Sequence, residues 1–385
     1  MGQGCRRRLI YIAEADWGTT PATPTMATLR NTGGSGLKLA RSSFKSAEMR
    51  SDRQIPFLRL GNKSASLSLP FELSDASYED MIASAMFSAW DAAAITTTLT
   101  GVECVVEADD DSYTRASGSW VDDGFAVGDR VRVSGFVTGA NNITGVITTL
   151  TATKMTLLGS ALSDETLATG GVFLRRKQIQ TGTTMKSFSI EEGFLDLSTP
   201  EYEMATGMVV DKMAIAIQPD AMITGSFDLL GKGLAAMSTT SGATTVTAAG
   251  TSEAMDSFTG VLYEGGAAIA IVTGINFSLA NGLESKPVLG STDAYRMGYG
   301  RSDVTGSLSF YMISGTLPNK FVNETASSLE IECADSTGKK MTFYFPSIKF
   351  TDKEKSVSEN DISVTMPFQA LYHGNSLSNL IIEVA

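Results

Sequence analysis

The sequence predicts a mainly β protein: two tandem β-sandwich or β-barrel domains, each with a flanking helix, and a small all-β domain inserted into the first. Serine, threonine, alanine and glycine are abundant, and charged residues make up only 19% of the 385 residues, which is typical of short strands joined by tight turns. Two segments of alternating polar and apolar residues, GNKSASLSLPF at 61–71 and GRSDVTGSLSFYM at 300–312, resemble each other. Between them, residues 101–173 have a different, acidic composition.

The two similar segments belong to a longer ordered match. Ser66–Leu69 aligns with Ser307–Phe310 at an offset of 241 residues, and Gly36–Leu39 aligns with Gly274–Phe277 at an offset of 238. Chance similarity is the alternative, because alternation of Ser or Thr with apolar residues is common in β-rich chains. Landmarks that keep both their order and their spacing favour a duplicated unit of about 125–140 residues, an ordinary domain size.

Further along the chain the offset changes abruptly. Ile223–Phe227 resembles Ile362–Met366 at an offset of only 139 residues. The first copy therefore contains 102 extra residues, which must lie between about 91 and 185. The compositionally distinct stretch 101–173, with its strand-like runs and Gly-Asp and Asn-Asn turns, lies within this interval. We therefore interpret it as an inserted β-domain.

These boundaries divide the chain into six parts. They are an N-terminal arm (1–35), the first part of domain 1 (36–100), the inserted small β-domain (101–173), the second part of domain 1 (174–230), a Thr/Ala/Gly-rich linker or long loop (231–257), and domain 2 (258–385). We expect an extended arm because Pro21, Pro24 and the Gly-Gly-Ser-Gly run at 33–36 disfavour regular structure. Ser42–Asn62 has many charges and few apolar residues, which favours a long exposed hairpin loop.

One segment has the periodicity of a helix. In Ser74–Trp90, apolar residues recur at three- and four-residue spacing and form a single stripe that suits packing on a sheet. Ser74 or Ser77 is the expected N-cap, with Asp80 in a capping-box position. Tyr78 aligns with Phe321, which places the second flanking helix near Phe321.

The net charge of −12 is unevenly distributed. Residues 1–60 carry +6, residues 61–100 carry −4, residues 101–173 carry −6 and residues 174–385 carry −8. A basic leader on an acidic body would let one copy dock on another. A solvated basic tail is the simpler alternative.

The sequence contains no recognisable catalytic, cofactor or metal site. A lone His373 excludes a two-histidine metal site, and Cys5, Cys104 and Cys333 are too far apart for a metal cluster or disulfide framework. Asp109–Asp111 lacks the glycine and glutamate of a calcium loop. Arg130 and Arg132 lie in an acidic module, which argues against binding nucleic acid. No run of apolar residues is long enough to cross a membrane, and no secretion signal is evident.

Four segments resemble the major tail tube proteins of long-tailed phages with non-contractile tails (the siphovirus tail tube family). They are IYIAEADWGTTPATP, SAEMRSDRQ, FELSDASYEDMIASAMFSAW and SFSIEEGFLDLSTPEYEMATGMVVDKMAIAI. The resemblance covers the chain outside residues 101–173. It implies tail-tube-type β domains and a structural virion protein, not an enzyme, that forms stacked rings around a hollow tube. DNA would pass through the lumen to the host without specific binding.

The resemblance also implies sites and partners. The arm and the charged loop would contact neighbouring subunits and rings, and the candidate contact residues are Arg6, Arg7, Arg8, Trp17, Lys45, Glu48, Arg50, Asp52, Arg53, Arg59, Arg296 and Arg301. With two tube domains per chain, three chains would close a ring of pseudo-sixfold symmetry; six chains per ring is the alternative. A tape measure protein and the tail terminator and distal tail proteins are the implied partners. The implied location is the virion tail, assembled in the host cytoplasm, with no membrane contact and no cofactor.

One rival function belongs to a different class. A surface-adhesion or ligand-binding protein could be built from the same β-sandwich modules, with the acidic insertion as its binding domain. Such a protein would normally carry a secretion signal and a cluster of aromatic ligand-binding residues, and the sequence shows neither.

Overall fold

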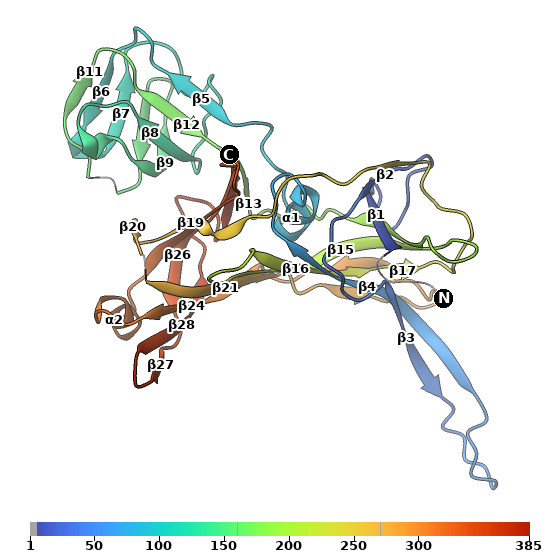
Figure 1. The fold of residues 1–385 in the computed structure, drawn as a ribbon. Helices are drawn as coiled ribbons and strands as arrows, with labels where there is room; N and C mark the ends of the chain where they lie inside the picture. Colours follow the sequence, from blue (N-terminus) through green and yellow to red (C-terminus); the bar gives the residue numbers. More distant parts are fainter. Residues whose placement is uncertain (1–5, 160, 270) are drawn as a thin grey trace. The chain divides into compact units, whose positions relative to one another are not determined.

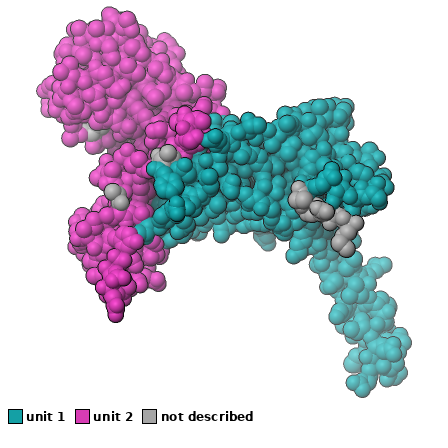
Figure 2. Space-filling view, in the orientation of Figure 1, with its two compact units in different colours: residues 1–88, 182–258, 273–307 teal, residues 89–181, 259–272, 308–385 magenta. Residues whose placement is uncertain are grey.

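A computed structural model describes residues 6–159, 161–269 and 271–385, and it confirms the prediction of a mainly β protein (Figure 1). The chain divides into two compact units (Figure 2). Unit 1 comprises residues 1–88, 182–258 and 273–307, and unit 2 comprises residues 89–181, 259–272 and 308–385. Because each unit collects segments far apart in the sequence, both depend on long-range strand pairing.

Unit 1 is built on antiparallel pairing in the order β14–β15–β16–β4–β3. The N-terminal strand β1 pairs with the other edge of β14, and β2 pairs with β1 and, in parallel, with β18. The strands assigned to this unit are β1 (Arg7–Ala13), β2 (Thr25–Thr28), β3 (Lys38–Lys45), β4 (Leu58–Glu72), β14 (Phe188–Phe194), β15 (Glu201–Ile217), β16 (Thr224–Gly231), β17 (Gly233–Leu234), β18 (Thr245–Thr247), β21 (Val272–Ala280), β22 (Glu284–Lys286) and β23 (Arg296–Gly298).

The helix α1 (Glu79–Met86) packs on β15 and is shorter than predicted. Every residue from Met81 to Met86 is buried, as the apolar stripe requires. The predicted serine cap is wrong, because the helix begins after Tyr78 and no side chain caps it. The Ser74 and Ser77 hydroxyls instead bond to each other at 2.8 Å, and each accepts a hydrogen bond from Arg30. Phe87, in the left-handed region at φ 49°, ends the helix before Trp90.

The predicted N-terminal arm is not a free extended segment. All seven residues of β1 pair with β14, so this strand is an integral part of the sheet. Leu9, Ile10 and Met26 are buried in the core. The prolines and glycines lie outside β1 and β2, and they therefore bend the chain between two short strands rather than keeping it extended. The segment 231–257 is likewise mostly loop, but it contributes β17 and β18 to the sheet.

Unit 2 contains a separate eight-stranded sheet between Ile95 and Arg175. Its strand order is β11–β6–β7–β10–β9–β8–β12–β5. Tyr113, Trp120 and Phe173 are fully buried at its centre, with the Trp120 and Phe173 rings 4.5 Å apart. The strands are β5 (Ile95–Thr98), β6 (Cys104–Glu107), β7 (Ser112–Arg115), β8 (Arg130–Ser134), β9 (Thr144–Leu150), β10 (Lys154–Leu157), β11 (Glu165–Leu167) and β12 (Val172–Arg175).

The rest of unit 2 is a second antiparallel sheet. β26 pairs with β25, β28 and β29, and β29 also pairs with β13, which follows the eight-stranded sheet in the chain. The helix α2 (Thr316–Val322) contains Phe321, where a second helix was expected. The elements are β13 (Lys177–Gln180), β20 (Ala267–Ala268), β25 (Ser327–Ala334), β26 (Lys340–Phe350), β27 (Glu354–Val357), β28 (Ile362–Ala370) and β29 (Ile381–Val384), while β19 (Asp256–Glu264) and β24 (Asp303–Tyr311) each contribute to both units.

Candidate assembly surfaces

The strands β3 and β4 form a long hairpin that projects from unit 1 (Figure 1). Their pairing runs from Lys38 opposite Ser66 to Lys45 opposite Leu58, which leaves residues 46–57 as the connecting loop. Every residue of β3 is exposed. The exposed hairpin predicted from Ser42–Asn62 is therefore present, and more of it is strand than predicted.

This hairpin exposes large apolar side chains as well as charges. Met49 at the tip is 98% exposed, and Phe44 and Phe57 are 58% and 61% exposed. Ile55, Leu58 and Leu60 are also more than half exposed. Exposed apolar side chains gathered on one hairpin often mark an interaction site, because their burial by a partner is favourable.

The charged residues proposed as contacts in this loop lie on the hairpin, and two of them pair with each other. Arg50 donates hydrogen bonds of 3.1 Å from Nε and 2.8 Å from Nη2 to the Asp52 carboxylate. This contact holds the pKa of Asp52 below its usual value. The contact spans a turn in which Arg53 has a φ of 59°. The side chains of Lys45, Glu48 and Arg59 are exposed, as are Arg296 and Arg301 elsewhere in unit 1.

Three of the predicted N-terminal contact residues already have partners within unit 1. Arg7 lies 3.4 Å from the buried Glu192 carboxylate, and Arg8 lies 3.8 Å from that of Glu191. The Trp17 indole donates a hydrogen bond of 3.0 Å to the Gly207 carbonyl. Arg6 is exposed. The basic leader thus neutralises buried glutamates of its own sheet, and Arg6 is the member that remains accessible.

A buried ionic cluster within unit 2 was not predicted. Arg130 of β8 donates hydrogen bonds to Glu383 of β29 at 2.9 Å and to Glu330 of β25 at 2.5 Å, and Arg132 donates to the same Glu383 oxygen at 2.6 Å. The Arg130 guanidinium also lies 4.3 Å from the centroid of the Tyr344 ring. Burial would raise the pKa of Glu383, but the two guanidinium groups outweigh burial and hold it below its usual value.

The same cluster continues around Arg176, next to β13. Arg176 donates a hydrogen bond of 3.2 Å to Glu332, which also accepts one of 2.6 Å from Lys340. The cluster joins the eight-stranded sheet to β25 and β29, so it fixes one part of unit 2 to another. In the sequence, the only indication of this cluster is that Arg130 and Arg132 alternate with Val131 and Val133. The glutamate partners of the two arginines lie about 200 residues or more away in the chain, so the sequence pattern could not identify them.

The sequence matches the family of phage tail tube proteins over residues 4–370, which is nearly its whole length. The chain belongs to the phage tail tube protein family. No curated protein gave a significant match. The tail tube protein is therefore a structural component of the virion tail, and the family assignment agrees with its β-rich fold.

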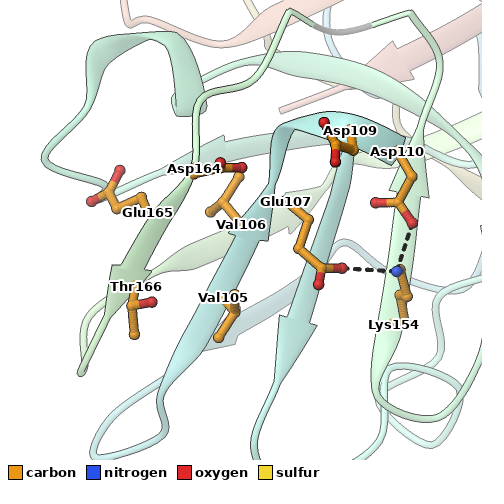
Figure 3. Close-up of a pocket in the computed structure, with 9 residues that line it drawn as sticks. All are labelled: Val105, Val106, Glu107, Asp109, Asp110, Lys154, Asp164, Glu165 and Thr166. Atoms are coloured by element: carbon orange, nitrogen blue, oxygen red, sulfur yellow. Dashed lines mark hydrogen bonds and ion pairs between the residues drawn. The ribbon is translucent and has the colours of Figure 1, made fainter.

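The tail tube protein carries an acidic groove on the eight-stranded sheet (Figure 3). Glu107, Asp110 and Lys154 lie on one side, where the Lys154 ammonium contacts both carboxylates at 2.8 and 2.6 Å. On the other side, Glu165 accepts hydrogen bonds from the Val137 and Thr138 amides and from Asn141. Among residues 6–159, 161–269 and 271–385, no group of acidic, histidine and cysteine side chains is arranged to hold a metal ion. The groove's carboxylates bond mainly to nearby groups of the same inserted segment.

The histidine and the two cysteines that the structure describes have structural environments, and Cys5 lies outside the described residues. His373 Nδ1 lies 2.9 Å from the Ser376 hydroxyl in a turn before β29. Cys104 and Cys333 are buried, and burial raises the pKa of each thiol to about 12. In the described part of the chain, no helix is both long and apolar enough to cross a membrane.

Proposed function

We propose that this tail tube protein forms rings that stack into a hollow tail tube, through which DNA passes to the host. The observation that carries the proposal is the exposed β3–β4 hairpin of a chain that belongs to the tail tube family. A protruding hairpin with exposed apolar side chains can reach and pack against a subunit of the next ring. The negative net charge of −12 is consistent with a lumen along which DNA slides without adhering.

Each chain, we propose further, contains two equivalent tube domains. The strands β14 and β25 begin 139 residues apart, and both have a register shift after their first residue, at Phe188/Ile190 and at Ser327/Leu329. The strand order β14–β15–β16–β4 then has a counterpart in β25–β26–β28–β24. Matching bulges support a common origin, because a bulge is a specific local feature rather than a consequence of composition.

Two domains per chain set the size of the proposed ring. Three chains would supply six equivalent domains and close a ring of pseudo-sixfold symmetry. The eight-stranded sheet is an insertion in the first domain, which the equivalent part of the second domain lacks. We expect such a tube in a non-contractile tail. Its expected partners are the tape measure protein, the tail terminator protein and the distal tail protein.

Electron microscopy of the purified protein tests this proposal. We expect hollow tubes in negative stain and end views with threefold symmetry and six similar lobes. Six chains per ring, measured by native mass spectrometry of single rings, would overturn the three-chain ring. Monodisperse monomers at high concentration, with no rings or tubes under any salt condition, would overturn the assembly function itself.

A further inference from the structure

One strand junction within the chain joins the two proposed domains. The C-terminal half of β15 pairs antiparallel with β21, from Lys212 opposite Ala280 to Ile217 opposite Ile275. Both strand segments belong to unit 1. The junction is apolar, because Met213 and Ile215 on β15 and Phe277 and Leu279 on β21 are all buried. The first proposed domain thus receives the first strand of the second domain on an edge of its sheet.

The second proposed domain has the same edge, and it is open. The C-terminal half of β15 corresponds to β27, because each follows a one-residue shift in strand register. In β15 the shift against β16 lies between Val210 and Lys212. In the β26–β27 segment the shift against β28 lies between Phe350 and Glu354. β15 ends at Ile217 and β27 at Val357, an offset of 140 residues. All four residues of β27 are exposed, and among the described strands β27 pairs with β28 alone.

The strand that would occupy this edge is also open. β21 corresponds to β3, because Gly274–Phe277 aligns with Gly36–Leu39. Among the described strands, β3 pairs with β4 alone, and its eight residues are all exposed. Each chain therefore contains one formed junction, between β15 and β21, and the two corresponding strands, β27 and β3, have open edges. Unpaired edges of this kind are usually covered, because their free backbone groups pair readily with other chains.

We propose that β27 of one chain pairs antiparallel with β3 of a second copy and so closes the ring. This inference rests on the proposed ring of duplicated domains. In the internal junction, Ile217 lies opposite Ile275 and Ala214 lies opposite Ser278. Adding the offset of 140 to the β15 residues and subtracting the offset of 238 from the β21 residues puts Val357 opposite Leu37 and Glu354 opposite Ala40. In this register Glu354 is the diagonal neighbour of Lys38 on the same face of the ladder.

The two junctions differ in chemistry. The internal one buries apolar side chains, whereas the one between chains is charged. Asp352 and Glu354 would lie on the same face of the ladder as Lys38, and these opposite charges attract. Lys353 would lie opposite Arg41 on the other face, and these like charges repel. Exposed charges of this kind are screened by salt. Ring closure is therefore the salt-sensitive step of assembly, and the internal junction is permanent.

Charge reversal tests the pairing. The Glu354→Lys substitution should weaken each contact between chains by about 1.4- to 5-fold, the range for a cross-strand charge pair, and three such contacts per ring multiply the effect on tube yield. Adding Lys38→Glu should restore assembly, and Lys353→Glu alone should strengthen it. Glu359→Lys, in the turn after β27, makes the same charge change off the ladder and is the matched control. Equal losses from Glu354→Lys and Glu359→Lys, without rescue by Lys38→Glu, would overturn the pairing.

Disulfide trapping gives a second, independent measurement. The double variant Glu354→Cys/Ala40→Cys should form a disulfide between chains on mild oxidation of assembled protein, and Glu354→Cys/Leu39→Cys, with its cysteines on opposite faces, should not. The unsubstituted chain controls for its native cysteines. Tubes that form without the expected crosslink would overturn this junction and leave the tube function intact. Failure of the unsubstituted protein to form rings or tubes would instead count against the proposed function.

Discussion

The Arg130 guanidinium donates a hydrogen bond of 2.9 Å to the carboxylate of Glu383, although the two residues are 253 positions apart in the chain. The side chain of Glu383 has no exposed surface and that of Arg130 is 5% exposed. A buried ion pair adds little net stability when complete, but the loss of one partner leaves an uncompensated charge. The connection between the eight-stranded sheet and β29 therefore depends on both residues.

Replacing Arg130 with methionine should lower the free energy of unfolding by about 3 kcal/mol, the lower end of the range for breaking a buried pair, because Arg132 still contacts Glu383. Urea denaturation followed by tryptophan fluorescence measures the change. Lys154→Met is the matched control, since its ion pairs with Glu107 and Asp110 are exposed and should contribute little. Similar losses in the two variants would show that burial of the cluster is unimportant.

Acid should destabilise unit 2 between the ordinary glutamate pKa and the lower folded-state pKa of two of its glutamates. The folded-state pKa values of Glu383 and Glu332 are both lowered by neighbouring cations. Their contribution to stability is therefore complete above the unfolded pKa of about 4.3 and is lost as the pH falls through the lower folded pKa. We expect the melting temperature to fall as the pH is lowered through this range. The Glu383→Gln substitution should make the melting temperature depend less steeply on pH there. A Glu383→Gln variant with an unchanged pH profile would contradict this assignment.

Excision of residues 95–175 with a short linker should give a less stable protein, because Glu330 and Glu383 lose Arg130 and Arg132. Glu383→Gln should then raise the melting temperature of the excised protein, although the same substitution should lower that of the full chain. The effect of Glu383→Gln on the melting temperature changes sign because the excision has already removed Arg130 and Arg132, the cations that compensate the Glu383 charge. If Glu383→Gln acts in the same direction in both backgrounds, the inserted sheet does not neutralise Glu383. Tube formation by the stabilised excised protein would show that the insertion is dispensable for assembly.

Deletion of residues 2–30 should impair folding as well as assembly. It removes β1 from β14 and takes Leu9, Ile10 and Met26 out of the core, each of which contributes about 1.5–3 kcal/mol when buried. Soluble expression and circular dichroism will detect this loss. Arg6→Glu is the sharper test of an N-terminal contact, because Arg6 is exposed and its replacement should leave folding intact. A stable, cooperatively folded deletion protein would contradict the structural role of β1.

The double variant Phe44→Ser/Phe57→Ser should abolish tube formation without changing the stability of the isolated chain by more than about 0.5 kcal/mol, as is usual for exposed positions. Both rings are on the hairpin and more than half exposed, so they lose little in the monomer. Phe258→Ser, at a phenylalanine that is 74% exposed on β19, is the control and should assemble normally. Normal tubes from the double variant would rule out the hairpin as an apolar contact between rings.

Local patterns were sufficient for several elements. The alternation in Ser66–Phe71 predicts the end of β4, the apolar stripe after Tyr78 predicts α1, and the charged Ser42–Asn62 predicts an exposed hairpin. The offset between the two similar segments also placed a second helix at Phe321. These features follow from periodicities of two and 3.6 residues, which are local properties of the chain.

By itself, the sequence determined that the protein is mainly β, that it resembles tail tube proteins, and that similar segments recur in it. Only the tertiary structure decided that Arg7–Ala13 is a strand of the sheet rather than an arm, that Arg130 neutralises Glu383, and that β27 and β3 have open edges. The reason is physical. Strand partners and buried charge partners are selected by contacts between residues some 180 to 250 positions apart, and no local pattern specifies which distant segment will supply them.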